Sequence, residues 1–412
     1  MRKDKIIYSV SVILCIALLV IGYFYATNGK SYYAESSGEV YLRARVKEII
    51  TNIPVYGDGG ELLSEDTVFE ATVTRGEMKG KTFTVYQNYS SYTPFNPRSV
   101  AVGDDVIIAH FEGVENWNFI DFVRSDAIIV LALLFGVLLI IFGRKKGLKT
   151  VLSLALTVLS VMFVFMPAII TGGNIYFWAV AVCIYIIFMT LIITDGISKM
   201  SLAASVGCAG GVLASLLLTY ITDSFIKISG NADPHSIYLL YIGEGLDLRA
   251  LIYASIIIGS VGAVMDVAVD IAASLKELAS KLEKPKKHEL FMSGINIGRD
   301  VIGTMSNTLV LAYIGGSMCS LLLYFYNTYS SPIYLFNIEI IIVELLKILV
   351  GSIGILLTLP LTAFVSAVIY TAKGTKKAKT ASDGFSDMLD AAGEFESARR
   401  NDSQVEVTED EK

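Results

Sequence analysis

The segment "ALIYASIIIGSVGAVMDVAVDIAASL" (residues 250–275) is apolar for longer than the roughly 20 residues that a helix needs to cross a bilayer. Two aspartates, Asp266 and Asp270, lie four residues apart inside it. An ionised carboxylate costs about 2.5–3.5 kcal/mol at the centre of a membrane helix, so such residues usually face a partner or a water-filled cavity. The segment therefore predicts both a membrane helix and a polar site on one of its faces.

The composition of the whole chain agrees with a membrane protein. Of its 412 residues, 54% are hydrophobic and only 17% are charged, whereas soluble proteins carry about 25% charged residues. We interpret the chain as a polytopic α-helical membrane protein with about eight spans. The expected spans are 6–26, 126–142, 148–167, 175–194, 202–221, 250–275, 301–326 and 340–370.

The positions of Lys and Arg set the expected orientation, because cytoplasmic loops are enriched in these residues. With the N-terminus inside, the clusters at 2–5, 144–149, 276–299 and 373–379 all lie on the cytoplasmic side. The short outer loops carry only Lys227 and Arg249. We therefore expect both termini in the cytoplasm.

Four domains are expected along the chain. Residues 1–26 form an N-terminal membrane anchor, and "YFYATNG" (23–29) is a poor signal-peptidase site. Residues 27–125 alternate like strands and predict an extracytoplasmic OB-like or SH3-like β-barrel. Residues 126–372 form a seven-helix membrane domain, and residues 373–412 form a disordered cytoplasmic tail. The barrel segment has 14 acidic and 9 basic residues, a balance that disfavours binding of nucleic acid.

Polar residues of the next expected helix supply partners for the aspartates. Asp266 and Asp270 share one helical stripe with Gly262. In 293–316, Asn307 is expected to reach about the depth of Asp266, and Arg299 to pair with Asp270. We interpret these residues as a solute-binding or ion-coupling site, with Asp266 exchanging a proton or cation. The candidate residues of this site are Asp266, Asp270, Asn307, Arg299, Asp300 and Thr304.

A second polar pair lies in the last expected span. Glu344 and Lys347 are separated by three residues, a spacing at which the two charges neutralise each other on a helix. We interpret them as a structural ion pair and keep a coupling role as the alternative.

Two adjacent motifs resemble the YibE/F-like family of bacterial membrane proteins. They are "GAVMDVAVDIAASLKEL" (262–278) and "SGINIGRDVIGTMSNTLVLAYIGG" (293–316), and the resemblance covers about residues 38–370. It implies a multi-pass protein of the bacterial inner membrane and assigns no biochemical activity. In the family the first aspartate is typical and the second position is often a small polar residue. The resemblance therefore supports a functional role for Asp266 more strongly than for Asp270.

Three classes of function are compatible with these features. The favoured one is a permease or exporter of a small solute or ion. The alternative is a non-transporting scaffold or sensor whose outer β domain recruits another membrane or cell-envelope protein. An aspartate-based membrane enzyme is the third, and we expect no enzyme because hydrolase and nucleotide-binding motifs are lacking. We expect no cofactor, no metal and no nucleic-acid partner, and the lipid bilayer as the surrounding medium.

Overall fold

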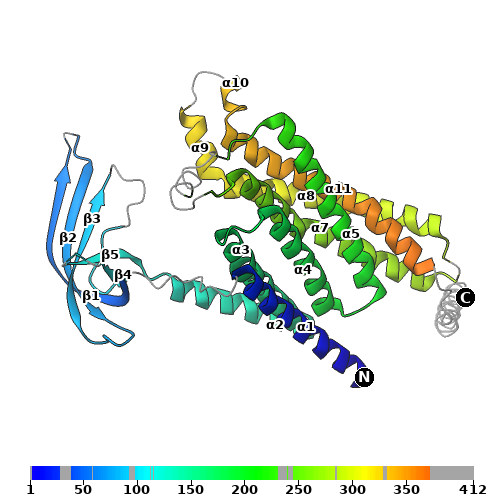
Figure 1. Ribbon diagram of the computed structural model, residues 1–412, viewed down its shortest axis with the longest axis horizontal. Coiled ribbons are helices and arrows are strands. Elements are labelled where there is room, and N and C mark those ends of the chain that lie inside the picture. The colour runs from blue at the N-terminus through cyan, green and yellow to red at the C-terminus, as the bar shows by residue number, and fades with distance from the viewer. Residues whose placement is uncertain are drawn as a thin grey trace, which may run out of the picture. The chain divides into compact units, whose positions relative to one another are not determined.

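The computed structural model describes residues 2–27, 39–57, 59–91, 98–111, 113–114, 116–230, 239, 245–283, 285–327 and 332–371. The predicted tail at 373–412 lies outside these residues. The chain is mostly helical and divides into two units (Figure 1). One unit comprises Gly29–Val151, and the other comprises Met1–Asn28 with Leu152–Lys412. Each unit is described by itself below.

The first unit contains a small closed β-barrel. Its strands pair in the order β1-β2-β3-β5-β4, and only the β3/β5 pair is parallel. This order is that of an OB-like barrel, which confirms the OB-like alternative predicted for residues 27–125. The strands are β1 (Val40–Tyr56), β2 (Leu62–Val73), β3 (Thr82–Ser90), β4 (Asp105–His110) and β5 (Trp117–Phe122).

The apolar side chains of the alternating strand pattern fill the interior of the barrel. Side chains such as Phe69, Val85 and Ile108 are completely buried inside it, as expected for a closed sheet whose successive residues face opposite sides. On the outside, Arg45 donates two hydrogen bonds to Asp105 at 3.0 Å. These bonds hold the pKa of the Asp105 carboxyl below its usual range.

Helix α2 (Ser125–Ser160) reverses direction at Arg144, which has a non-helical backbone (φ 49°, ψ −125°). A Cβ atom at Gly147 would collide with the carbonyl oxygen of Leu139, and one at Gly136 would lie 4.0 Å from Val151. Residues 15 positions apart are separated by about 22 Å along a straight helix, so these contacts require that the helix folds back on itself. The segment is therefore a helical hairpin, as the separate spans predicted at 126–142 and 148–167 imply.

The second unit contains the remaining helices. A π-helical turn (η1, Val161–Phe165) and α3 (Met166–Ile170) follow the hairpin. The bent α8/α9 pair replaces the single helix predicted at 301–326, because the chain turns by 63° between the two. The other elements are α1 (Arg2–Thr27), α4 (Ile175–Asp195), α5 (Lys199–Ile226), α7 (Leu248–Lys281), α8 (Lys287–Gly316), α9 (Met318–Asn327), α10 (Pro332–Leu335) and α11 (Glu339–Thr371).

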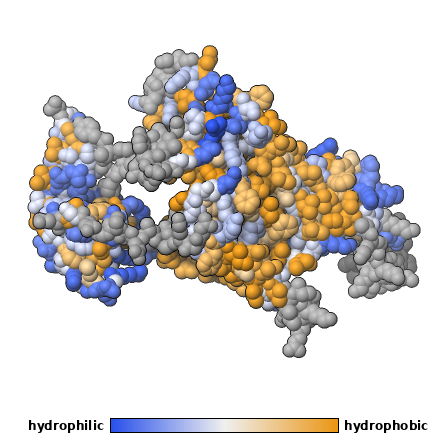
Figure 2. All heavy atoms as spheres, in the orientation of Figure 1, coloured by the Kyte–Doolittle hydropathy of each residue, from blue (hydrophilic) through white to orange (hydrophobic). Residues whose placement is uncertain are grey.

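Several of these helices have the length and apolar character of membrane spans. In the part of the chain that is described, six helices meet both criteria, or seven if the bent α8/α9 pair forms one span. The six include the α2 hairpin counted once together with η1 and α3. Figure 2 shows apolar side chains gathered on the visible surface of the helical unit, where a soluble protein would carry polar ones.

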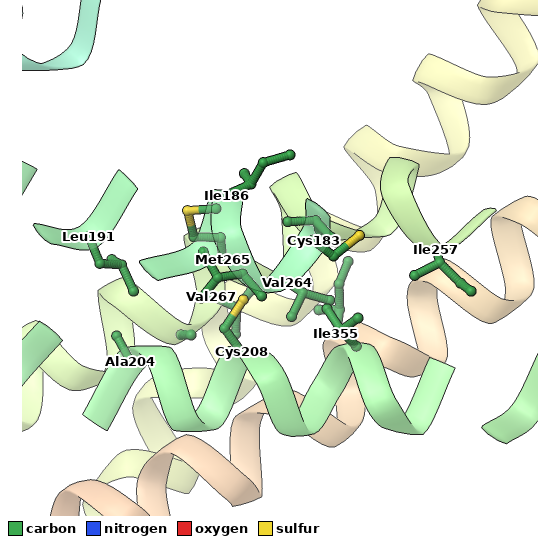
Figure 3. Packing of buried hydrophobic residues seen from close by; sticks show 14 of the residues in the cluster. Cys183, Ile186, Leu191, Ala204, Cys208, Ile257, Val264, Met265, Val267 and Ile355 are labelled. Carbon is green, nitrogen blue, oxygen red and sulfur yellow. The ribbon is translucent and has the colours of Figure 1, made fainter. Parts of the chain in front are cut away.

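Helix α7 lies at the centre of the helical core, where it packs against α4, α5, α8 and α11. Figure 3 shows the interlocking side chains of Cys183 from α4, Cys208 from α5, Val264 from α7 and Ile355 from α11. Glycines bring α5 and α11 close together, because a Cβ atom at Gly207 or Gly211 would collide with a threonine hydroxyl of α11. Small residues of this kind are typical of helix pairs within membranes.

Candidate functional site

The exposed stripe of α7 carries the two aspartates. Helix α7 begins at Leu248 and is capped by Asp247, whose side chain accepts a hydrogen bond from the Ala250 amide at 3.1 Å. Its buried residues are mostly Ala, Val and Ile, and they include the larger side chains of Tyr253, Met265 and Leu275. Asp266 and Asp270 lie on the exposed stripe together with Gly262, and all three are exposed. The shared stripe predicted from the sequence is therefore present.

The polar residues of α8 also lie on its exposed side. Gly294 and Gly298 are buried against Ala363 and Leu359 of α11, and this contact fixes which face of α8 turns inward. The polar residues on the outer side are Arg299, Asp300, Thr304 and Asn307, all of them exposed. The Thr304 hydroxyl donates to its own helix, at the carbonyl oxygen of Val301 (2.8 Å).

Two contacts set the register between α7 and α8. A Cβ atom at Gly294 would lie 2.9 Å from Leu275, and near the other end a Cβ atom at Gly259 would collide with the Tyr313 hydroxyl. The helices are thus antiparallel, and interpolation between these contacts brings Asp270 level with position 300, within about one residue of Arg299. Asp266 comes level with a point between Thr304 and Met305.

This register refines the predicted depth of Asn307. Asn307 lies about two residues, or about 3.5 Å, beyond the level of Asp266 along the helix axis. Among the described residues, no hydrogen bond or ion pair joins Asp266 or Asp270 to Arg299 or Asn307. The structure therefore places the candidates on two neighbouring helices.

The second predicted pair is formed. Lys347 donates a hydrogen bond to Oε1 of Glu344 at 2.7 Å, and the side chains are only 22% and 15% exposed. The other carboxylate oxygen of Glu344 and the hydroxyl of Tyr313 are buried and have no hydrogen-bond partner among the described atoms. A buried polar atom without a partner is costly, so these two atoms are the least satisfied polar groups beside the ion pair.

A polar cluster that the sequence reading missed lies where α5 and α7 meet. Tyr253 donates a short hydrogen bond to Asp223, and both residues line a cavity of about 450 Å³ with Tyr176. Glu339 of α11 accepts hydrogen bonds from the amides of Ser229 (2.9 Å) and Gly230 (2.7 Å). The sequence gives little indication of the interactions of Asp223 and Glu339, because single polar residues at helix ends are normally interpreted as caps.

The described residues contain no group of three or more His, Cys, Asp or Glu side chains that could hold a metal ion. Of the cysteines, Cys15, Cys183 and Cys208 are buried thiols and Cys319 is exposed.

The family described as YibE/F-like protein matches residues 131–372, which include every candidate residue of α7, α8 and α11. Searches of curated proteins and of solved structures found no match.

Proposed function

This chain belongs to the YibE/F-like family, and from that premise we propose that it is a multi-pass permease or exporter of a small solute or ion. The polar residues of α7 and α8 are proposed to form its coupling site. The proposed location is the bacterial inner membrane with both termini in the cytoplasm, and the distribution of Lys and Arg supports this orientation.

Eight spans are the best account of the apolar helices. The segment Ser125–Ile170 contains 46 residues, which would extend about 69 Å as one helix, more than twice the roughly 30 Å of a hydrocarbon core. Its reversal at Arg144 divides it into two spans, with Lys145 and Lys146 beside the turn. The six helices become seven spans when the hairpin is counted as two. The bent α8/α9 pair, counted as one span, is the eighth.

The observation that carries the transport proposal is the position of Asp266. This carboxylate lies in the middle of an apolar helix, seven residues from Gly259 and nine from Leu275, and it is exposed. Lipid is the most costly environment for such a group, because charge in hydrocarbon is unfavourable. A wet route beside α7 provides the solvation that the carboxylate needs, and intramembrane carboxylates on such routes commonly bind protons or ions.

A flux screen in proteoliposomes tests this proposal. Purified protein is reconstituted at a fixed protein-to-lipid ratio, and its orientation in the vesicles is determined. Uptake of inorganic ions, amino acids and sugars is then measured with and without a proton gradient. Protein-dependent flux of at least one class that responds to the gradient supports the permease. Absence of flux across all classes, from protein that stays folded, contradicts it.

The scaffold or sensor alternative draws on the outer barrel. Beyond its pairing with β4, which ends at Arg45, β1 continues as an arm paired with β2. In this arm Ile50, Ile53, Val55 and Tyr56 are each about half exposed or more. Exposed apolar side chains on a paired arm are a common feature of protein-binding surfaces. Loss of partner capture on truncation of this arm, with flux unchanged, would assign the arm a recruiting role.

A further inference from the structure

Two polar faces of the helical unit carry exposed residues in the described part of the chain. One is the stripe of α7 that contains Gly262, Asp266 and Asp270, and the other is the side of α8 that contains Arg299 and Gly303. Gly259 belongs to the same stripe of α7 and touches Tyr313 of α8. The two faces therefore border each other and form one surface, which we name the α7/α8 face.

The α7/α8 face is unsuited to lipid. It presents the carboxylates of Asp266 and Asp270 and the guanidinium of Arg299 at the depth of the membrane helices, where each charge is costly unless it is paired. The carboxylate of Asp300 lies next to Arg299 on the exposed side of α8.

The α7/α8 face also presents glycines without neighbours, since a Cβ atom at Gly262 or Gly303 would meet nothing within 4 Å. Glycines that pack inside this bundle, such as Gly298, meet another helix instead. The α7/α8 face thus has the surface of a helix–helix interface whose partner is a separate chain.

The charges on the face select that partner. Asp270 and Arg299 lie within about one residue of the same level along the helix axes but form no ion pair within the described chain. A two-fold axis along the membrane normal keeps every residue at its level, so it opposes Asp270 of each copy to Arg299 of the other. Two-fold interfaces of this kind are the commonest in homo-oligomers.

We propose that the α7/α8 face packs against the same face of a second copy of this chain, through two reciprocal Asp270–Arg299 ion pairs. The inference rests on the proposed membrane placement of α7 and α8. Asp266 of one copy then lies near the level of Thr304 of the other, so the coupling site is completed between copies.

Charge reversals tested in two differently tagged copies separate this arrangement from an ion pair within one chain. Asp270→Arg places two arginines at the level of the ion pair, and Arg299→Asp places two aspartates there. Each variant expressed alone should lose self-association by at least about tenfold, as expected for like charges replacing a desolvated pair. Co-expression of the two variants should restore association, because every contact between unlike copies again joins Asp to Arg.

The control is Lys287→Glu, a reversal at an exposed residue at the start of α8, which should associate like the wild type. Recovery only when both reversals are in one chain would overturn the proposal in favour of a pair within each copy. Wild-type association in both single variants, or a monomeric wild type in native membranes, would also overturn it. Flux from a monomeric protein would support the permease proposal and refute the interface. Association without flux would support the interface and refute the permease proposal.

Discussion

Replacement of Gly211 by alanine should destabilise the helical core, where α5, α7 and α11 meet. The added Cβ atom would collide with the Thr358 hydroxyl, and it would lie 3.1 Å from Cβ of Thr358 and 3.0 Å from Cγ1 of Val264. Rotation of the hydroxyl relieves only the first contact, so the helices must move apart. Overpacking costs about 1–3 kcal/mol, and the better helix propensity of alanine returns up to about 1 kcal/mol.

The expected net loss is about 1–2 kcal/mol, which lowers Tm by about 2–8 °C for a domain of this size. The buried thiols of Cys15, Cys183 and Cys208 provide the assay, since a fluorogenic maleimide reaches them only on unfolding. The measurement uses a Cys319→Ser background, because that thiol is exposed. Gly315→Ala is the matched control, since its Cβ would meet nothing within 4 Å. Equal melting temperatures for the Gly211 variant and the parent would refute the proposed close packing.

Three further outcomes are expected. An impermeant maleimide should label Ser90→Cys in intact cells of a cysteine-free variant, and labelling only after lysis would contradict the outer location of the barrel. The fragment 38–122 should fold alone as a monomeric β domain with negligible DNA affinity at physiological salt, and a random-coil circular dichroism spectrum would show that it needs the rest of the chain. Because Arg45 lowers the pKa of Asp105, the ion pair stabilises the barrel above the unfolded-state pKa and loses this effect as the pH falls below about 4. Asp105→Asn should therefore melt lower at pH 7 and show a smaller decrease on acidification, and parallel pH curves for the two proteins would refute this assignment.

The helices and the barrel could be predicted because their signals are local. Long apolar runs mark α4, α5 and α11, and the alternation in residues 40–110 marks strands whose inner side chains fill the barrel. The break before Lys145 divides one apolar stretch into two arms of a hairpin, which hydropathy alone detects.

The extent and orientation of α8 depended on contacts distant in sequence. Its first turns are polar, so hydropathy placed the helix at residue 301, whereas the structure begins it at Lys287. Helical periodicity showed which polar residues share a face. It could not show that Gly294 and Gly298 pack against α11. This packing leaves Asn307 exposed and brings Thr304 close to the level of Asp266. Similarly, Asp223 and Tyr253 meet only because α5 and α7 pack together.

The central claim is that the carboxylate of Asp266 couples transport, and Asp266→Asn tests it most directly. Asparagine keeps the shape and hydrogen-bonding capacity of the side chain and removes its charge and its titration. The flux of the solute identified in the proteoliposome screen is measured for this variant, for Asp270→Asn and for the wild type at equal amounts of folded protein. We expect flux at background level for Asp266→Asn and a milder reduction for Asp270→Asn. Wild-type flux and wild-type gradient dependence in Asp266→Asn would contradict the claim.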